Sequence, residues 1–174
     1  LIANQLPNEG KDKTIAFLDV GAVCSHLYIF HNLKVIFVKE EEFGGQYLVQ
    51  ALAVHLDKSV DDAADAIKTG NLPDDYQTAV LVPFIEQLVL QIKRTLQFFY
   101  STTPYNGLDH IVLAGGVSKT PVLVAKIQDL LNVTVSVANP LANIQIDNKV
   151  LAESLKGESA SLMLACGLAM REID

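Results

Sequence analysis

Residues 14–22 have the sequence TIAFLDVGA, and this stretch decides how the chain folds. Its first part is mostly apolar, which is typical of a buried β-strand. The Gly21-Ala22 turn leads into a second run of β-forming residues over 24–30, and His31-Asn32 supplies turn residues before a third run over 34–41. The start of the chain therefore predicts an antiparallel meander of three strands.

Two helices are predicted after this meander. Leucines recur every four residues from Leu48 to Leu56, as on one face of an amphipathic helix. Ser59 is followed three residues later by Asp62, a start signal of the capping-box type, and Gly70 is a stop signal. A short second helix is expected between these signals.

The longest helical pattern begins near Asp74, and Pro83 is expected to kink its early turns. Together with the two helices before it, this pattern predicts a small, mainly helical subdomain at residues 44–101. That subdomain would be inserted into a core sheet subdomain formed by residues 14–43 and 102–174.

Alternating strands and helices are predicted for the rest of the chain. Residues 109–114 read as a short strand that is apolar enough to be buried on both faces, and it ends at Gly115-Gly116. Thr120-Pro121 is typical of a helix start, residues 133–137 of a further strand, and residues 159–171 of a last helix rich in Ala and Gly. The order βββαβαβα predicts an α/β fold with a mixed five-stranded sheet.

The amino-acid composition argues against several classes of protein function. The chain has 174 residues, half of them apolar, so a globular domain with a real core is expected. Its net charge of −7 and scattered basic residues argue against a nucleic-acid partner. No apolar run is long enough to span a membrane, and two cysteines build no disulfide framework, which favours the cytoplasm. Because the chain begins at Leu1 without Met, we expect a piece of a longer protein.

Two bends carry the patterns that are typical of anion binding. Asp19 to Ala22 can direct backbone N–H groups at an anion, with Gly21 allowing close approach and the Asp19 carboxylate holding a water or a metal. Gly115-Gly116 follows a buried strand, at the strand end where α/β sheets bind ligands. Taken alone, an ordinary hairpin turn is the simpler interpretation of the first bend, and an ordinary strand-to-helix turn explains the second equally well.

Several familiar sites are excluded. Residues 115–120 read GGVSKT but fail the P-loop pattern, because Ser118 precedes Lys119 and Leu113 stands where that loop has its first Gly. The chain has no G-x-G-x-x-G, no Ser-His-Asp arrangement and no matched carboxylate pair, so no catalytic residue is assigned.

Cys24, His26 and His31 raise the question of a metal site. A closed zinc site needs four ligands, and sequence spacing supplies no fourth. No metal is therefore assigned to these three residues.

The motifs in their order resemble one lobe of the actin-like, ribonuclease H-like fold shared by actin, heat-shock chaperone ATPases, sugar kinases, FtsA and MreB. More closely, they resemble the PilM family of type IV pilus assembly, and they span residues 14–172. The stretches that carry this resemblance are FLDVGA (17–22), FGG (43–45), LPDDY (72–76), LQFFYS (96–101), DHIVLAGG (109–116), SVANP (136–140) and LACGLAMR (164–171).

The resemblance implies that residues 1–174 are the second, C-terminal lobe of an ATP-binding clamp. Asp19 would reach Mg²⁺ through water, and the acid and the lysine of a helix at 64–68 would reach ribose and adenine. Asp65 stands where the relatives have Glu, and Ala22 where several have Gly. The implied nucleotide contacts are Asp19, Gly21 and Ala22 at the phosphates, Gly44 and Gly45 beside ribose and phosphates, Asp65 and Lys68 at the nucleoside, and Gly115, Gly116, Val117 and Ser118 around the adenosine.

The resemblance also implies a function. The intact protein would be a cytoplasmic ATP-binding scaffold at the inner face of the inner membrane, with little or no hydrolysis, acting in fimbrial biogenesis and twitching motility. It would bind the cytoplasmic tail of PilN and other alignment or motor proteins. The side of this lobe that faces the first lobe, including the Ala/Gly side of the last helix, would be exposed and available for self-association.

Two other functions of the same superfold stay open from the sequence. One is a small-molecule kinase, for which Asp19 is the sole candidate catalytic carboxylate at the bends. The other is an FtsA-like filament protein.

Overall fold

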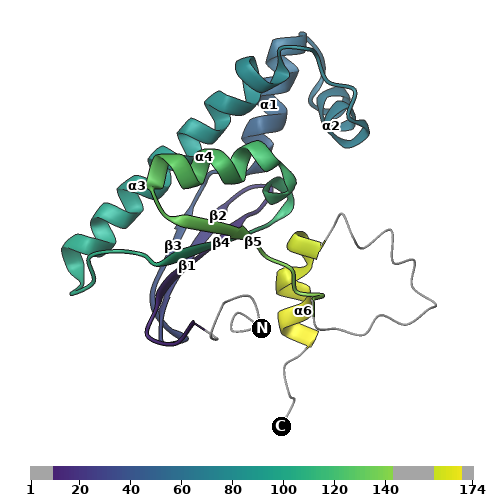
Figure 1. Ribbon diagram of the computed structural model, residues 1–174. Coiled ribbons are helices and arrows are strands. Elements are labelled where there is room, and N and C mark those ends of the chain that lie inside the picture. Colours follow the sequence, from purple (N-terminus) through teal and green to yellow (C-terminus); the bar gives the residue numbers. More distant parts are fainter. Residues whose placement is uncertain (1–9, 143–158, 170–174) are drawn as a thin grey trace.

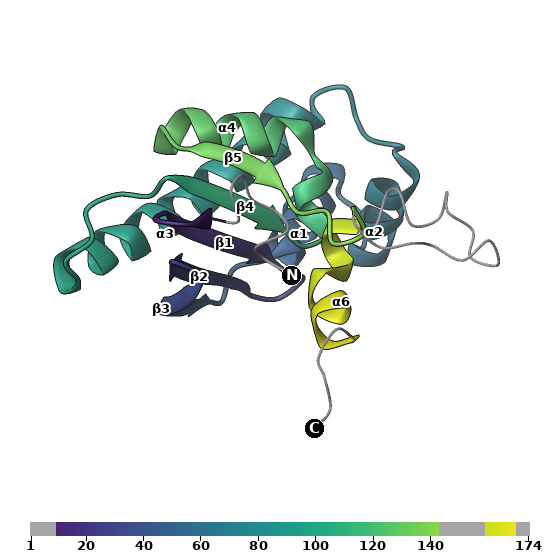
Figure 2. The ribbon, with the colours of Figure 1, turned by 60° about the horizontal axis from the view of Figure 1, so that its bottom comes forward.

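The computed structural model describes residues 10–142 and 159–169. Within them, one mixed sheet has the strand order β3-β2-β1-β4-β5 (Figures 1 and 2). The meander β1-β2-β3 is antiparallel, and β4 and β5 continue the sheet in parallel with β1. The strands are β1 (Thr14–Val20), β2 (Ser25–His31), β3 (Lys34–Glu41), β4 (His110–Ala114) and β5 (Thr134–Val137). The predicted α/β class and mixed five-stranded sheet are confirmed.

Helices cover both faces of this sheet. In Figure 1, α3 and α4 lie over one face, α1 and α2 extend beyond one end of it, and α6 lies below. The helical segments are α1 (Gly45–Leu56), α2 (Val60–Thr69), a π-helical turn η3 (Gln77–Leu81), α3 (Val82–Thr102), a 3-10 turn η4 (Gly116–Lys119), α4 (Pro121–Leu131), a 3-10 turn η5 (Ser159–Leu162) and α6 (Met163–Ala169). None of the helices in the described ranges is both long and apolar enough to cross a bilayer.

Helix ends follow the sequence signals closely at α2. The Ser59 hydroxyl accepts from the Asp62 N–H at 3.1 Å, which is the N-cap half of a capping box, and the Asp62 carboxylate accepts from the same hydroxyl at 2.7 Å. Gly70 ends the helix in the left-handed region, with φ of 75°. At α4, by contrast, the Thr120 side chain makes no capping hydrogen bond, and Pro121 alone marks the first turn.

Directly before Pro83, where the sequence predicts a kink, the structure has the π-helical turn η3. The Val82 N–H donates to Gln77 O, which widens the last turn before the proline. The wider turn is compatible with Pro83, because proline has no N–H to donate to the preceding turn of the helix.

The sheet separates two apolar clusters because strand side chains alternate between its faces. The larger cluster joins β1 and β2 to α3 and α4 and continues without a break into α1, α2 and η3. The smaller one lies on the opposite face, where Met163 of α6 packs near Phe17 and Val112. Since α3 belongs to both the helical layer and the sheet core, the proposed subdomain boundaries at 44 and 101 stay a prediction.

Asp109 holds the first residues of β1 and β4 together. Its carboxylate accepts from the Thr14 N–H at 2.8 Å and from Lys13 Nζ at 2.9 Å, and its own N–H donates to Thr14 O. These hydrogen bonds hold the pKa of Asp109 below its usual value. The hydrogen bonds of Asp109 favour the parallel register of β1 and β4. In this register, Asp19 lies beside Ala114 at the other end of the two strands.

Candidate functional site

Three bends far apart in the sequence meet at the end of the sheet where β1 and β4 finish. Asp19 pairs with Ala114, so the chain that follows each strand leaves the sheet at the same rim. The first bend is a hairpin closed by the Gly21 N–H, which donates to Cys24 O at 3.0 Å. The second is the η4 turn after Gly115.

Gly115 brings the first two bends into direct contact. Its φ is 88°, in the region that only glycine adopts without strain. A Cβ at this position would lie 2.2 Å from Val20 O and 2.8 Å from Asp19 Oδ1. The close approach of the two bends therefore requires glycine at position 115.

The loop at Gly44-Gly45 forms the third bend and ties the other two together. Gly45 N–H donates to Gly21 O and Gln46 N–H to Ala22 O, both at 2.8 Å. A Cβ on Gly44 would lie 2.6 Å from Ala22 O. A Cβ on Gly45 would lie 3.2 Å from Val117 Cγ2. The first N–H groups of α1 are thus used by the hairpin itself.

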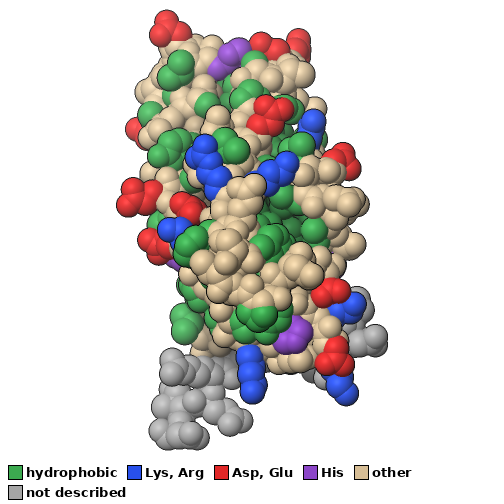
Figure 3. Space-filling view, turned by 90° about the vertical axis from the view of Figure 1, so that its left-hand side faces the viewer, with side chains coloured by type: hydrophobic (Ala, Val, Ile, Leu, Met, Phe, Trp, Pro, Cys, Tyr) green, Lys and Arg blue, Asp and Glu red, His purple; other side chains and the backbone are tan. Residues whose placement is uncertain are grey.

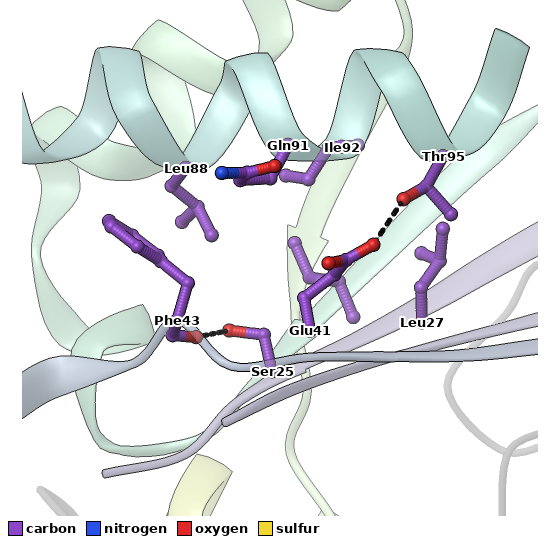
Figure 4. Close-up of a pocket in the computed structure, with 9 residues that line it drawn as sticks. Ser25, Leu27, Glu41, Phe43, Leu88, Gln91, Ile92 and Thr95 are labelled. Atoms are coloured by element: carbon purple, nitrogen blue, oxygen red, sulfur yellow. Dashed lines mark hydrogen bonds between the residues drawn. The ribbon is translucent and has the colours of Figure 1, made fainter. Parts of the chain in front are cut away.

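Phe43 anchors this loop through a small cavity below the hairpin (Figure 4). The Ser25 hydroxyl donates to Phe43 O, and the Phe43 ring stacks on Phe84 with centroids 5.2 Å apart. Across the cavity, the Thr95 hydroxyl donates to Glu41 Oε1 at 3.0 Å. The free volume of this cavity is about 10 Å³, room for at most one water.

Gly116 and Ser118 have different surroundings within the second bend. No non-neighbouring atom of residues 10–142 and 159–169 lies within 4 Å of a Cβ built on exposed Gly116, so this part of the chain leaves space beside that residue. Ser118 is 1% exposed, and its hydroxyl donates to Gly115 O at 2.6 Å. Its side chain therefore stabilises the bend rather than reaching outward.

Asp19 places a carboxyl group at this rim. It is partly buried, and burial raises its pKa above the usual value, while the nearby His26 acts in the opposite direction. A cation placed beside Asp19 would stabilise its ionised form.

Asp19→Asn is expected to stabilise the ligand-free protein at neutral pH, because Asn has nearly the same size and carries no charge that burial would penalise. The raised pKa of Asp19 means that the native fold holds the proton more tightly than the unfolded chain does. Below the unfolded pKa, near 3.8, wild type and variant should be equally stable, and wild type should lose stability as pH rises through the folded pKa. Urea unfolding at about pH 3 and at neutral pH measures this difference.

Asp109→Asn is the matched control for that measurement. Because hydrogen bonds lower the pKa of Asp109, its replacement should destabilise the protein at neutral pH, with the opposite sign. An Asp19→Asn variant that is less stable than wild type at neutral pH would contradict the assignment of Asp19 as a desolvated carboxylate.

Asp65 and Lys68, the residues expected at the nucleoside, lie on α2 and are exposed. Asp65 lines a separate hollow between α2 and the loop after it, together with Lys58 and Pro73. Among the hydrogen bonds found in residues 10–142 and 159–169, none joins either residue to the three bends. The structure thus brings together the three bends and leaves their contact with α2 a prediction.

α6 carries exposed apolar side chains, and the expectation that its Ala/Gly side faces the first lobe stays a prediction. Leu164 and Leu168, one turn apart, are 69% and 60% exposed.

On the face shown in Figure 3, at the left of Figure 1, hydrophobic side chains lie between scattered basic and acidic ones.

Sequence reasoning missed one grouping near this rim. Cys24, His26 and Glu40 place a thiol, an imidazole and a carboxylate within 4.8 Å of one another. His31, which was considered with the first two, bonds instead to the Thr14 hydroxyl at 3.1 Å. The alternation within β2 and the β2–β3 hairpin register could have indicated Glu40 as their neighbour.

Comparison with known families identifies the chain. A family described as type IV pilus assembly protein PilM matches residues 1–173. The chain belongs to the PilM family. Among solved structures, a PilM–PilN type IV pilus biogenesis complex matches with 25% identity and a TM-score of 0.81, over 94% of this chain and 47% of that one.

More distant matches show the actin-like fold of this PilM family member. MreB5 of Spiroplasma citri bound to AMPPNP matches with 13% identity and a TM-score of 0.60, over 78% of this chain and 50% of that one. The archaeal actin homologue Ta0583 in complex with ADP matches with 11% identity and a TM-score of 0.63, over 93% and 51%. The chain thus spans about half the length of these proteins.

Proposed function

We propose that this chain is the second lobe of an actin-like, ATP-binding scaffold in type IV pilus assembly. The observation that carries this proposal is the meeting of three glycine-containing bends at one sheet rim, with Gly115 packed against Val20. Two proteins of similar fold support the proposal, because MreB5 is bound to AMPPNP and Ta0583 is in complex with ADP. Membership of the PilM family supports the pilus role.

The residues at the rim fit a nucleotide with its magnesium ion. The hairpin after Asp19 would approach the phosphates, and the open bend at Gly116 would approach the adenosine. Magnesium would neutralise phosphate charge, and Asp19 would hold one of its waters. Asp65 and Lys68 would contribute from α2 in the intact protein.

The scaffold needs binding but not turnover. ATP held between two lobes shifts the protein toward the closed arrangement by its difference in affinity for the two states. Exposed Leu164 and Leu168 on α6 would then contact the first lobe. We place the protein in the cytoplasm at the inner membrane, with the PilN tail as a partner, because a related structure is a PilM–PilN complex.

Gly116→Val is expected to lower ATP affinity about tenfold or more without loss of stability. The new side chain meets no atom of the described part of the chain, but it would occupy the position where a nucleotide approaches the backbone. Calorimetric titration of the intact protein with ATP and magnesium measures this loss. Gly107→Val is the matched control, because a Cβ on Gly107 likewise meets no described residue within 4 Å and Gly107 lies away from the three bends.

Two results would contradict the proposal. Equal ATP affinity of wild type and Gly116→Val would remove the second bend from the site. Sustained phosphate release by the wild-type protein that is lost in Asp19→Ala would mean that the protein is an enzyme of the same superfold and not a scaffold.

A further inference from the structure

The sheet register aligns three polar residues in a row beside the first bend. His26 of β2 lies opposite Asp19 of β1 on one side and opposite Glu40 of β3 on the other. Residues directly opposite in neighbouring strands project from the same face of a sheet. Cys24 precedes β2 by one residue and is two residues from His26, so it joins this row at the hairpin.

From this arrangement, we infer that Cys24, His26 and Glu40 form a binding site for a divalent transition-metal ion of the zinc class. Their ligand atoms lie within 4.8 Å of one another, and His26 Nε2 is 2.9 Å from Glu40 Oε2. Donor atoms around one tetrahedral zinc ion lie about 3.5 Å apart. Small side-chain rotations therefore bring all three ligands to one ion.

The donor set selects the class of metal. A thiolate and an imidazole bind zinc, cobalt and similar ions, whereas magnesium and calcium prefer oxygen ligands. The set supplies three protein ligands, since Glu40 joins Cys24 and His26 through the β2–β3 pairing. Three ligands leave one position for water or for a group from outside the chain.

The surroundings favour a cation and hold the ligands in place. The His26 ring stacks on Tyr28, with centroids 6.2 Å apart and planes at 15°. Cys24 and His26 are partly buried, and Glu40 is exposed on edge strand β3, so the position is reached from solvent. Asp19 adds a second carboxyl group beside His26.

The chain contains a built-in comparison. His55 and Asp75 form another imidazole–carboxylate pair, with 3.0 Å between Nε2 and Oδ1. No cysteine belongs to that pair, because the two free cysteines are Cys24 and Cys166. If a metal ion bound any exposed His–carboxylate pair, it would bind at His55 and Asp75 as well as at His26 and Glu40.

Titration of the reduced, nucleotide-free full-length protein with cobalt(II) chloride tests the inference. We expect a thiolate-to-cobalt charge-transfer band that saturates at one equivalent and disappears when zinc chloride is added. Cys24→Ser should abolish the band. His26→Ala and Glu40→Gln should weaken cobalt affinity about tenfold or more. Glu40 is exposed, so Glu40→Gln is expected to fold normally.

Cys166→Ser and His55→Ala are the matched controls, and both should bind cobalt as wild type does. The inference is overturned if no saturable band forms, if the band survives Cys24→Ser, or if Glu40→Gln binds cobalt with wild-type affinity. The assay contains no nucleotide, so its failure is distinguishable from a failure of the nucleotide proposal.

Discussion

Gly115→Ala is expected to lower the free energy of unfolding by about 3 kcal/mol, or the melting temperature by about 6–12 °C. Alanine at φ of 88° is strained, and its Cβ would lie 2.2 Å from Val20 O. The obstacle is backbone at the end of a buried strand, so it cannot swing aside as a flexible side chain would. The two bends must separate, and nucleotide affinity should fall with stability. Urea and thermal unfolding measure the first effect.

Gly116→Ala is the control for this prediction. The two glycines are adjacent, but a Cβ on Gly116 meets nothing within 4 Å among the residues that the structure describes, and its φ is outside the left-handed region. Its stability should stay within about 0.5 kcal/mol of wild type. If Gly115→Ala were equally harmless, the close packing of the two bends described above would be wrong.

Phe99→Ala is expected to cost about 3–5 kcal/mol of folding free energy, the largest loss that we predict from a side-chain truncation. Phe99 is fully buried where α3 crosses the sheet. Its ring contacts those of Phe37, Tyr100 and Tyr105, with centroids 5.3, 5.4 and 5.9 Å away. Removing it leaves a cavity that a rigid helix and sheet cannot close.

Phe98→Ala provides the comparison, because Phe98 has the same side chain one position earlier and is 59% exposed. We expect its loss to cost less than about 1 kcal/mol. Denaturant unfolding of both variants at one pH separates them. Similar losses at the two positions would mean that α3 is rotated about its axis from the orientation described here.

Strand and helix positions were largely predictable from local sequence. The predicted runs at 14–20 and 34–41 coincide with β1 and β3, and Ser59 and Gly70 flank α2 as expected. Alternation, capping residues and glycine stops act over a few neighbouring residues. The π-helical turn before Pro83 and the uncapped Thr120 were missed, because tertiary packing selects among several local solutions there.

The candidate site was predictable in part. The bends at Gly21 and Gly115 stand out in the sequence, yet each pattern alone fits an ordinary turn. Their significance comes from the parallel pairing of β1 with β4, which joins segments some ninety residues apart. The place of Ser118, buried within its own turn, was likewise not visible in the motif.

By itself, the sequence determined the order of strands and helices, the family and the two glycine bends, because these depend on residue types and short-range spacing. The tertiary structure alone decided that Gly115 packs on Val20, that Gly45 bonds to Gly21, and that Glu40 joins Cys24 and His26. The physical reason is that strand register and backbone contact are collective results of long-range hydrogen bonding and core packing. No short stretch of sequence encodes them separately.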